Sequence, residues 1–386
     1  MKIRYIFLLM LMVMASNMLY ADDSEKSLIG SQAIGFDLRP SWVIPTNEFL
    51  KSKPEGHHEN SASISPNIRY SFKYSPSSRQ GRLYPTVYQG IGLSYSAFLP
   101  DGTLGNPVNV YVFQGARLAS ISSRLSLDYE WNFGISAGWK NYNHETNPTN
   151  GAIGSKVNAL INLGIILSYK LNEKWVIRAG VEGTHFSDGN TVLPNAGVNS
   201  CGARIGLAYI FNDKKEEFSG IDELFRRHWS YDLTVYGAAR QRMFESKIVP
   251  GHFGIMGMNF APMYGLNRYL RCGVSADFQY DESANLDENF AGYNYEDEPM
   301  FYRQPFKERF SAGLSLRAEL TMPIFSINIG IGRNIIAKGK DTEIWYQSLA
   351  LKAYVFKNSY LQIGYQLKDF HQPNNLMLGV GYSFGK

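Results

Sequence analysis

The chain has few cysteines, little net charge and, after its first residues, no long apolar run. Cys201 and Cys272 are its only cysteines, so a disulfide framework is excluded, and no metal-ligand spacing surrounds either of them. No later stretch approaches the ~18 consecutive apolar residues of a transmembrane helix. The formal net charge of +4 at pH 7 does not indicate a class of partner, and no pattern indicates nucleic-acid binding.

The first 21 residues have the pattern of a secretory signal peptide. Lys2 and Arg4 provide a basic start, the run Ile6–Met14 is apolar throughout, and Ala21 precedes a plausible cleavage point. The apolar run is too short to span a bilayer. We therefore expect residues 1–21 to direct export and to be removed.

Aromatic residues and glycine are abundant, with 25 Tyr, 23 Phe and 36 Gly. A chain rich in both, without long apolar runs, is typical of an outer-membrane β-barrel. A soluble secreted β-sandwich shares part of this composition and is the alternative fold.

Alternation of apolar and polar residues continues through the mature chain. In the segment 156–170, Ile161, Leu163 and Ile165 share one face, while Asn158 and Asn162 lie on the other. Successive side chains of a strand point to opposite faces, so this pattern fits a wall between lipid and a polar lumen. The same period predicts strands at about 31–45, 61–76, 86–99, 106–118, 122–139, 156–170, 174–187, 197–212, 230–246, 250–266, 268–281, 307–322, 324–338, 344–357, 359–369 and 375–384.

The predicted fold is all-β, a transmembrane antiparallel β-barrel built from an eight-stranded unit that is duplicated. Gly206–Phe211 resembles Gly379–Phe384 in sequence, and the charged segment 213–228 separates the two halves. Two barrels of eight strands, at 22–212 and 229–386, and one barrel of sixteen strands both fit. The long charged linker favours two, because periplasmic turns within one barrel are normally short.

Three polar residues fall on the face that strand parity assigns to lipid. In 174–187, Val181 shares its face with His185 and Ser187, and the parity of the next strand places Asn199 on that face too. Polar groups facing lipid are costly unless they lie at the interface or serve a function. A seventh strand runs outward in an even-stranded barrel, so this cluster is expected at the extracellular end. A Ser and a His two residues apart can act as nucleophile and general base.

The same stretch resembles a known family. His-x-Ser-x-Gly at 185–189, followed by Pro-Asn-x-Gly at 194–197, is similar to the active-site signature of the PagL-type lipid A 3-O-deacylases. The resemblance covers about residues 31–212, most strongly 174–212, whereas the second half shares only the general pattern of barrel strands. In that family an eight-stranded barrel carries a Ser–His–Glu triad on its outer face and removes a fatty acid from lipid A.

The resemblance implies a role for each matching residue. Ser187 would be the nucleophile and His185 the base. Asn195 and backbone N–H groups near Gly189 would hold the oxyanion, whose stabilisation is often the largest catalytic contribution.

Two positions depart from the family pattern. The triad Glu is replaced by Asn199, and the Asn that follows the nucleophile is replaced by Asp188. An Asn can accept a hydrogen bond from the imidazole and orient it, but it cannot stabilise the imidazolium by charge. Asp188 could supply that charge, although strand parity points it away from His185.

The sequence therefore predicts an outer-membrane serine esterase that removes an ester-linked acyl chain from lipid A or a related outer-leaflet lipid. It requires no cofactor or metal, and its catalytic residues are His185, Ser187 and Asn199. The alternative is a non-catalytic structural or transport barrel with a degenerate esterase motif. A pore would need a wider lumen than eight strands provide, so a barrel of sixteen strands would favour this alternative.

Other polar groups are interpreted as loop residues. They are His57 and His58, His371 with Asn374 in the second half, and the acidic residues between Asp281 and Glu298. His371 occupies the position where a second site would lie, but Pro373 stands where its Ser would be. The acidic residues could bind divalent cations through carboxylate oxygens, although their spacing matches no known loop motif.

Overall fold

The computed structural model describes residues 29–46, 48–51, 61–99, 103–213, 225–245, 247–370 and 372–385. The predicted signal peptide and most of the predicted linker lie outside these ranges. Within them, no helix is long and apolar enough to cross a membrane.

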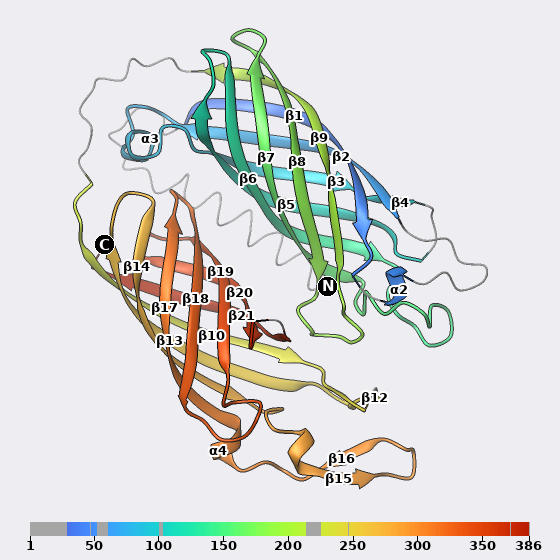
Figure 1. Cartoon of the computed structure of the whole chain (residues 1–386). Coiled ribbons are helices and arrows are strands. Elements are labelled where there is room, and N and C mark those ends of the chain that lie inside the picture. Colours follow the sequence, from blue (N-terminus) through green and yellow to red (C-terminus); the bar gives the residue numbers. More distant parts are fainter. Residues whose placement is uncertain are drawn as a thin grey trace. The chain divides into compact units, whose positions relative to one another are not determined.

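The first half forms a closed antiparallel barrel (Figure 1). Its strands are β1 (Ile29–Ile44), β2 (Ala62–Tyr74), β3 (Tyr88–Tyr95), β4 (Ala97–Leu99), β5 (Gly105–Ser120), β6 (Leu125–Trp139), β7 (Val157–Lys170), β8 (Trp175–Ser187) and β9 (Val198–Asp213). Both β3 and β4 pair with β2, so together they occupy one of the eight strand positions. Pairing of β1 with both β2 and β9 closes the barrel. Short helices α2 (Glu48–Lys51) and α3 (Arg79–Leu83) lie between the strands.

The second half closes into a separate eight-stranded barrel in which β21 pairs with β10. Its strands are β10 (Trp229–Arg240), β13 (Phe253–Gly265), β14 (Leu270–Asp281), β17 (Phe310–Thr321), β18 (Phe325–Ile336), β19 (Trp345–Tyr354), β20 (Ser359–Lys368) and β21 (Gln372–Phe384). The all-β barrel prediction is confirmed. Of its two alternatives, the structure has two barrels of eight strands and not one of sixteen.

The strand predicted at 230–246 is divided in the structure, where β10 ends at Arg240. The loops of the second barrel contain short elements that alternation did not predict as separate strands or helices. These are β11 (Met243–Phe244), β12 (Lys247–Ile248), the 3-10 helix η1 (Asp287–Asn289), β15 (Phe290–Tyr293), β16 (Pro299–Phe301) and α4 (Phe306–Arg309). Two-residue and three-residue strands are too short to show a period in sequence.

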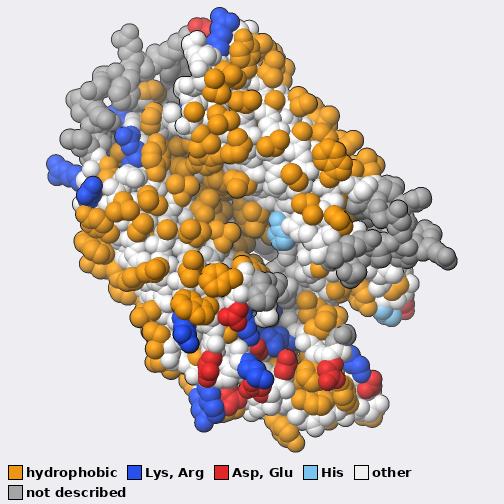
Figure 2. Space-filling model, in the orientation of Figure 1, with side chains coloured by type: hydrophobic (Ala, Val, Ile, Leu, Met, Phe, Trp, Pro, Cys, Tyr) orange, Lys and Arg blue, Asp and Glu red, His pale blue; other side chains and the backbone are white. Residues whose placement is uncertain are grey.

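The two predicted faces of β7 are confirmed. Ile161 and Leu163 are exposed on the outer face, whereas Asn158, Asn162 and the apolar Ile166 are buried on the inner face. Figure 2 shows the same property more widely, with hydrophobic side chains spread over the outer surface of the strands. An apolar exterior around a polar interior is the arrangement of a membrane barrel.

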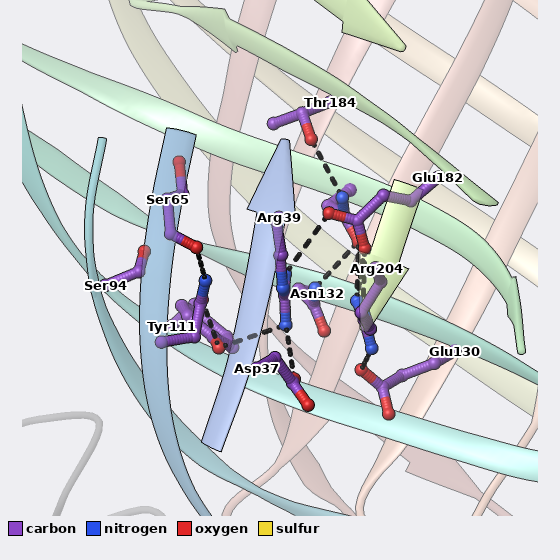
Figure 3. A network of polar contacts seen from close by, with 12 residues as sticks. Asp37, Arg39, Ser65, Ser94, Tyr111, Glu130, Asn132, Glu182, Thr184 and Arg204 are labelled. Atoms are coloured by element: carbon purple, nitrogen blue, oxygen red, sulfur yellow. Dashed lines mark hydrogen bonds and ion pairs between the residues drawn. The ribbon is translucent and has the colours of Figure 1, made fainter. Parts of the chain in front are cut away.

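A network of ion pairs fills the middle of the first barrel (Figure 3). Arg204 is 0% exposed, and its guanidinium lies 2.5 Å from Oε1 of Glu130 and 2.6 Å from Oε2 of Glu182. Glu130 also pairs with Arg69 at 2.6 Å and with Arg178 at 3.0 Å. Buried charges are tolerated only when they are paired. Glu130 and its three arginines therefore hold four strands, β2, β6, β8 and β9, in register.

The two ends of the first barrel differ. At the short-turn end, β5 is joined to β6 and β7 to β8 by the brief turns 121–124 and 171–174, while the connection 75–87 between β2 and β3 contains α3. At the long-loop end, β6 is joined to β7 and β8 to β9 by residues 140–156 and 188–197. Outer-membrane barrels have short periplasmic turns and longer extracellular loops.

Aromatic packing closes the lumen at the long-loop end. The ring centroids of Trp139 and Phe186 are 4.9 Å apart, and those of Trp139 and Phe98 are 5.3 Å apart. Leu160 and Val198 belong to the same buried cluster. The inward faces of β8 and β9 are therefore anchored to a rigid core directly behind their outer faces.

Removal of the central carboxylate should destabilise the first barrel. Glu130→Gln leaves Arg69, Arg178 and Arg204 without their shared counter-charge, and breaking such a buried network typically costs about 3–5 kcal/mol. Denaturant unfolding in lipid vesicles, followed by tryptophan fluorescence, measures the change. Asp128→Asn is the control, because Asp128 lies on the same inner face of β6 but accepts its hydrogen bond from Ser168. Equal stability of the two variants would contradict the central role of Glu130.

Candidate functional site

The predicted site residues lie at the long-loop end of β8 and at the start of β9. Phe186 and Val198 point into the lumen, where they are 4% and 0% exposed. Alternation therefore directs their neighbours His185, Ser187 and Asn199 to the outer face, where all three are half-buried. Three polar side chains are thus gathered on the apolar outside of the wall.

His185 and Asn199 are direct partners across the β8–β9 pair. Nδ1 of His185 lies 2.8 Å from Oδ1 of Asn199. An amide oxygen can only accept, so the hydrogen of this bond resides on Nδ1 of the imidazole. Nε2 of His185 consequently keeps its lone pair and can accept a proton from a hydroxyl group.

Thr46, which the sequence did not single out, holds the other end of the Asn199 amide. Nδ2 of Asn199 donates to Oγ1 of Thr46 at 3.1 Å across a separation of 153 residues. Thr46 follows β1, and Ile44 at the end of β1 is paired with Asn199. Only closure of the barrel brings β1 beside β9, and no local motif could have identified this contact.

Asn195 contacts the candidate nucleophile. Its Nδ2 donates to Oγ of Ser187 at 2.9 Å, and its Oδ1 accepts from the backbone N–H of Asp188 at 3.4 Å. Asp188 therefore contributes its backbone to the site by orienting Asn195. The amide group of Asn195 is therefore held beside the hydroxyl group of Ser187, next to where a substrate oxyanion would form if Ser187 attacked an ester.

The loop that carries Asn195 depends on glycine at its end. Gly197 has a φ of +74°, which favours glycine over residues that have a Cβ atom. A Cβ atom at this position would lie 2.9 Å from Cε1 of His185. The N–H of Gly197 donates to the carbonyl of Ala152 at 2.9 Å, which ties this loop to the neighbouring one. Gly189, at the start of the loop, has a φ of +69°.

An apolar surface surrounds the polar cluster. Leu163 of β7, Val181 of β8 and Ile205 of β9 are exposed on the outer face. The cluster therefore borders a surface on which hydrocarbon chains can lie, and it can react with a group held at the edge of that surface.

Among the described residues, the other polar groups that the sequence analysis named do not form a comparable site. His57, His58 and His371 lie outside the described residues. Asp281 points inward and pairs with Arg240 at 2.6 Å. In the part of the chain that the structure describes, no three His, Cys, Asp or Glu residues are grouped to hold a metal ion.

Two family models match the chain. One, described as lipid A 3-O-deacylase (PagL), matches residues 47–208. The other, described as acyloxyacyl hydrolase, C-terminal domain, matches residues 229–386. The second half therefore has a family assignment of its own, which its strand pattern alone did not indicate. No curated protein sequence matches the chain.

Solved structures with some similarity are membrane proteins of low sequence identity. The FrpB iron transporter from Neisseria meningitidis is 12% identical, with 83% of this chain and 55% of that chain covered and a TM-score of 0.20. This chain thus spans about half of that transporter. An outer membrane channel from Pseudomonas putida F1 is 12% identical, with 95% and 99% covered and a TM-score of 0.18.

Gly197→Ala should disturb His185 without unfolding the barrel. The left-handed backbone costs about 1–2 kcal/mol for a residue with a Cβ atom, and the new methyl group must displace the imidazole. The resonances of the His185 ring in histidine-labelled protein should move. Gly183→Ala is the control, because a Cβ atom there would meet no atom closer than 3.9 Å. Unchanged His185 resonances in Gly197→Ala would contradict the packing described above.

Proposed function

Because the chain belongs to the lipid A 3-O-deacylase (PagL) family, we propose that Ser187 and His185 hydrolyse an acyl ester of lipid A or a related outer-leaflet lipid. Family membership makes the protein an outer-membrane hydrolase that acts on ester bonds. The observation that carries the finer proposal is the contact of His185 with Asn199 on the outer wall, 2.8 Å long. It leaves Nε2 of His185 as a base on the same face as Ser187.

The reaction would follow the usual course of acyl transfer to serine. Oγ of Ser187 attacks the ester carbonyl while Nε2 of His185 takes its proton. The side-chain amide of Asn195 and the backbone N–H of Gly189 stabilise the oxyanion. His185 then protonates the leaving alkoxide. His185 next takes a proton from a water molecule, whose oxygen attacks the acyl carbon bound to Ser187. The bond between that carbon and Oγ of Ser187 breaks, the fatty acid leaves, and His185 gives its proton to Oγ.

The location of the site supports a lipid substrate in the outer leaflet. His185 and Ser187 lie at the long-loop end of β8, which corresponds to the extracellular end of an outer-membrane barrel. Their half-buried position beside exposed apolar residues such as Val181 lets acyl chains lie along the wall with the ester at the polar cluster. No cofactor is required for this chemistry.

The filled lumen of the first barrel does not favour the alternative function, a structural or transport barrel. The side chains of Arg204 and Glu130 are fully buried in the lumen, and aromatic rings fill its long-loop end. A small barrel filled by side chains provides no open pore.

Ser187→Ala should abolish deacylation and leave the barrel folded. Mass spectrometry of lipid A from cells that express each variant measures the reaction, and loss of one acyl chain is expected only with Ser187 intact. Ser200→Ala is the control, because Ser200 is buried on the lumen face of β9. Identical lipid A with the intact protein and with Ser187→Ala would contradict the proposal.

The neutral amide of Asn199 should make activity depend on Thr46. If Thr46 did not hold Nδ2, the amide could turn, donate to Nδ1 of His185 and select the tautomer that cannot act as base. We expect Thr46→Val to lower kcat by roughly tenfold, equivalent to about 1.4 kcal/mol, and to change the ring ¹⁵N shifts of His185. Thr46→Ser keeps the hydroxyl group and should stay active.

The Asn199→Glu background tests the same idea. A carboxylate accepts through either oxygen and also stabilises the imidazolium, so kcat should rise and Thr46→Val should then change it by less than about twofold. An equal loss from Thr46→Val in both backgrounds would show that Thr46 acts on stability and not on the orientation of the amide.

A further inference from the structure

The lumen of the first barrel opens at the short-turn end into a cavity of about 220 Å³. It lies at the opposite end of the barrel from the esterase site. Arg178 lines it, and Ser187 lies nine positions further along β8, which corresponds to roughly 30 Å at ~3.3 Å per residue. The cavity is therefore separate from the outer-face site.

Positive charge dominates the lining of this cavity. Its basic side chains include Arg117, Arg124 and Lys170, whereas Asp128 is the single acidic residue among those that line it. Oδ2 of Asp128 already accepts from Ser168 at 2.6 Å. The cavity therefore differs from the middle of the lumen, where the buried arginines and carboxylates compensate one another.

Arg117 contributes a buried donor group to the lining of the cavity. Nε of Arg117 is buried and has no hydrogen-bond partner in the described structure. A buried polar group without a partner is costly. Among the described residues, the side chains of Arg124 and Lys170 also form no ion pair. Nε of Arg117 loses this penalty when an anion accepts a hydrogen bond from it, and the exposed side chains of Arg124 and Lys170 add positive charge around that anion.

The serines of the lining define the chemistry of that anion. Ser122 and Ser126 add hydroxyl groups to the cationic side chains. Guanidinium groups and hydroxyls together bind oxyanions such as phosphate, and arginine does so through paired N–H donors. The volume lies below the roughly 300 Å³ at which typical small-molecule pockets begin, which suits a compact polar group and not an acyl chain.

We propose that this cavity is a binding site for a phosphate-bearing anion that enters from the periplasmic side. The group could belong to a free phosphate compound or to the head of an anionic phospholipid in the inner leaflet. The site does not depend on the esterase chemistry, because none of its residues belongs to the outer-face cluster.

Isothermal titration of the full chain in non-ionic detergent tests this site with pyrophosphate and inorganic phosphate as probes. We expect saturable binding that weakens by about tenfold or more in Arg124→Gln/Lys170→Gln, since hydrogen bonds to charged groups are the stronger class. Both residues are exposed, so the double variant should fold. Arg117→Gln should weaken binding similarly. Lys174→Gln is the control, because it removes a positive charge at the same end but outside the lining.

The source of the anion is distinguished by repeating the titration in nanodiscs. If phosphatidylglycerol nanodiscs suppress pyrophosphate binding and phosphatidylcholine nanodiscs do not, the lipid head group occupies the cavity. If both permit binding equally, a free phosphate compound is the ligand. Absence of binding to either probe at about 10 mM, or an equal loss in Lys174→Gln, would overturn the proposal.

Discussion

Strand alternation in a closed barrel places each residue either in the lumen or on the outer face, and the rest of the first barrel depends on this constraint. Inward charged residues must be paired with an opposite charge, as Glu130 is with Arg69, Arg178 and Arg204. Outward residues must be apolar where they face the hydrocarbon of the membrane. His185, Ser187 and Asn199 depart from the second requirement at one end of one hairpin. Polar side chains on a lipid-facing surface cost free energy, so their presence there indicates a functional site.

The third residue of the candidate triad, Asn199, has a neutral amide in place of a carboxylate. Oδ1 and Nδ2 of Asn199 are chemically distinct, so its orientation must be set by a further group, and Thr46 is placed to do so. The aromatic core behind Phe186 and the loop contact of Gly197 fix the strands from the other side. The neutral amide of Asn199 is therefore accompanied by neighbours that hold it in the orientation in which it accepts from His185.

The strands and the candidate site residues could be predicted from the sequence, because strand period and motif spacing are local properties. The faces of β7 and the outward direction of His185 and Ser187 follow directly from alternation. The long charged linker favoured two barrels, but the strand pattern also fitted one, because strand closure depends on which distant edges pair, as β1 does with β9. The contact of Thr46 with Asn199 could not be predicted for the same reason, because it forms only when β1 and β9 pair. The cavity lined by Arg117, Arg124 and Lys170 also has no sequence signature, since Arg117 and Lys170 lie near the ends of two strands and Arg124 lies in a turn.

The central claim is that the oxygen of Ser187 is an activated nucleophile on the lipid-facing wall. Treatment of the detergent-solubilised full chain with a lipophilic fluorophosphonate, followed by peptide mass mapping, tests it most directly. The account predicts that fluoride is displaced and a single phosphonyl group is bonded to Ser187, at a rate that falls when His185 is replaced by glutamine. Modification elsewhere, or none at Ser187 while other serine esterases react under the same conditions, would contradict it.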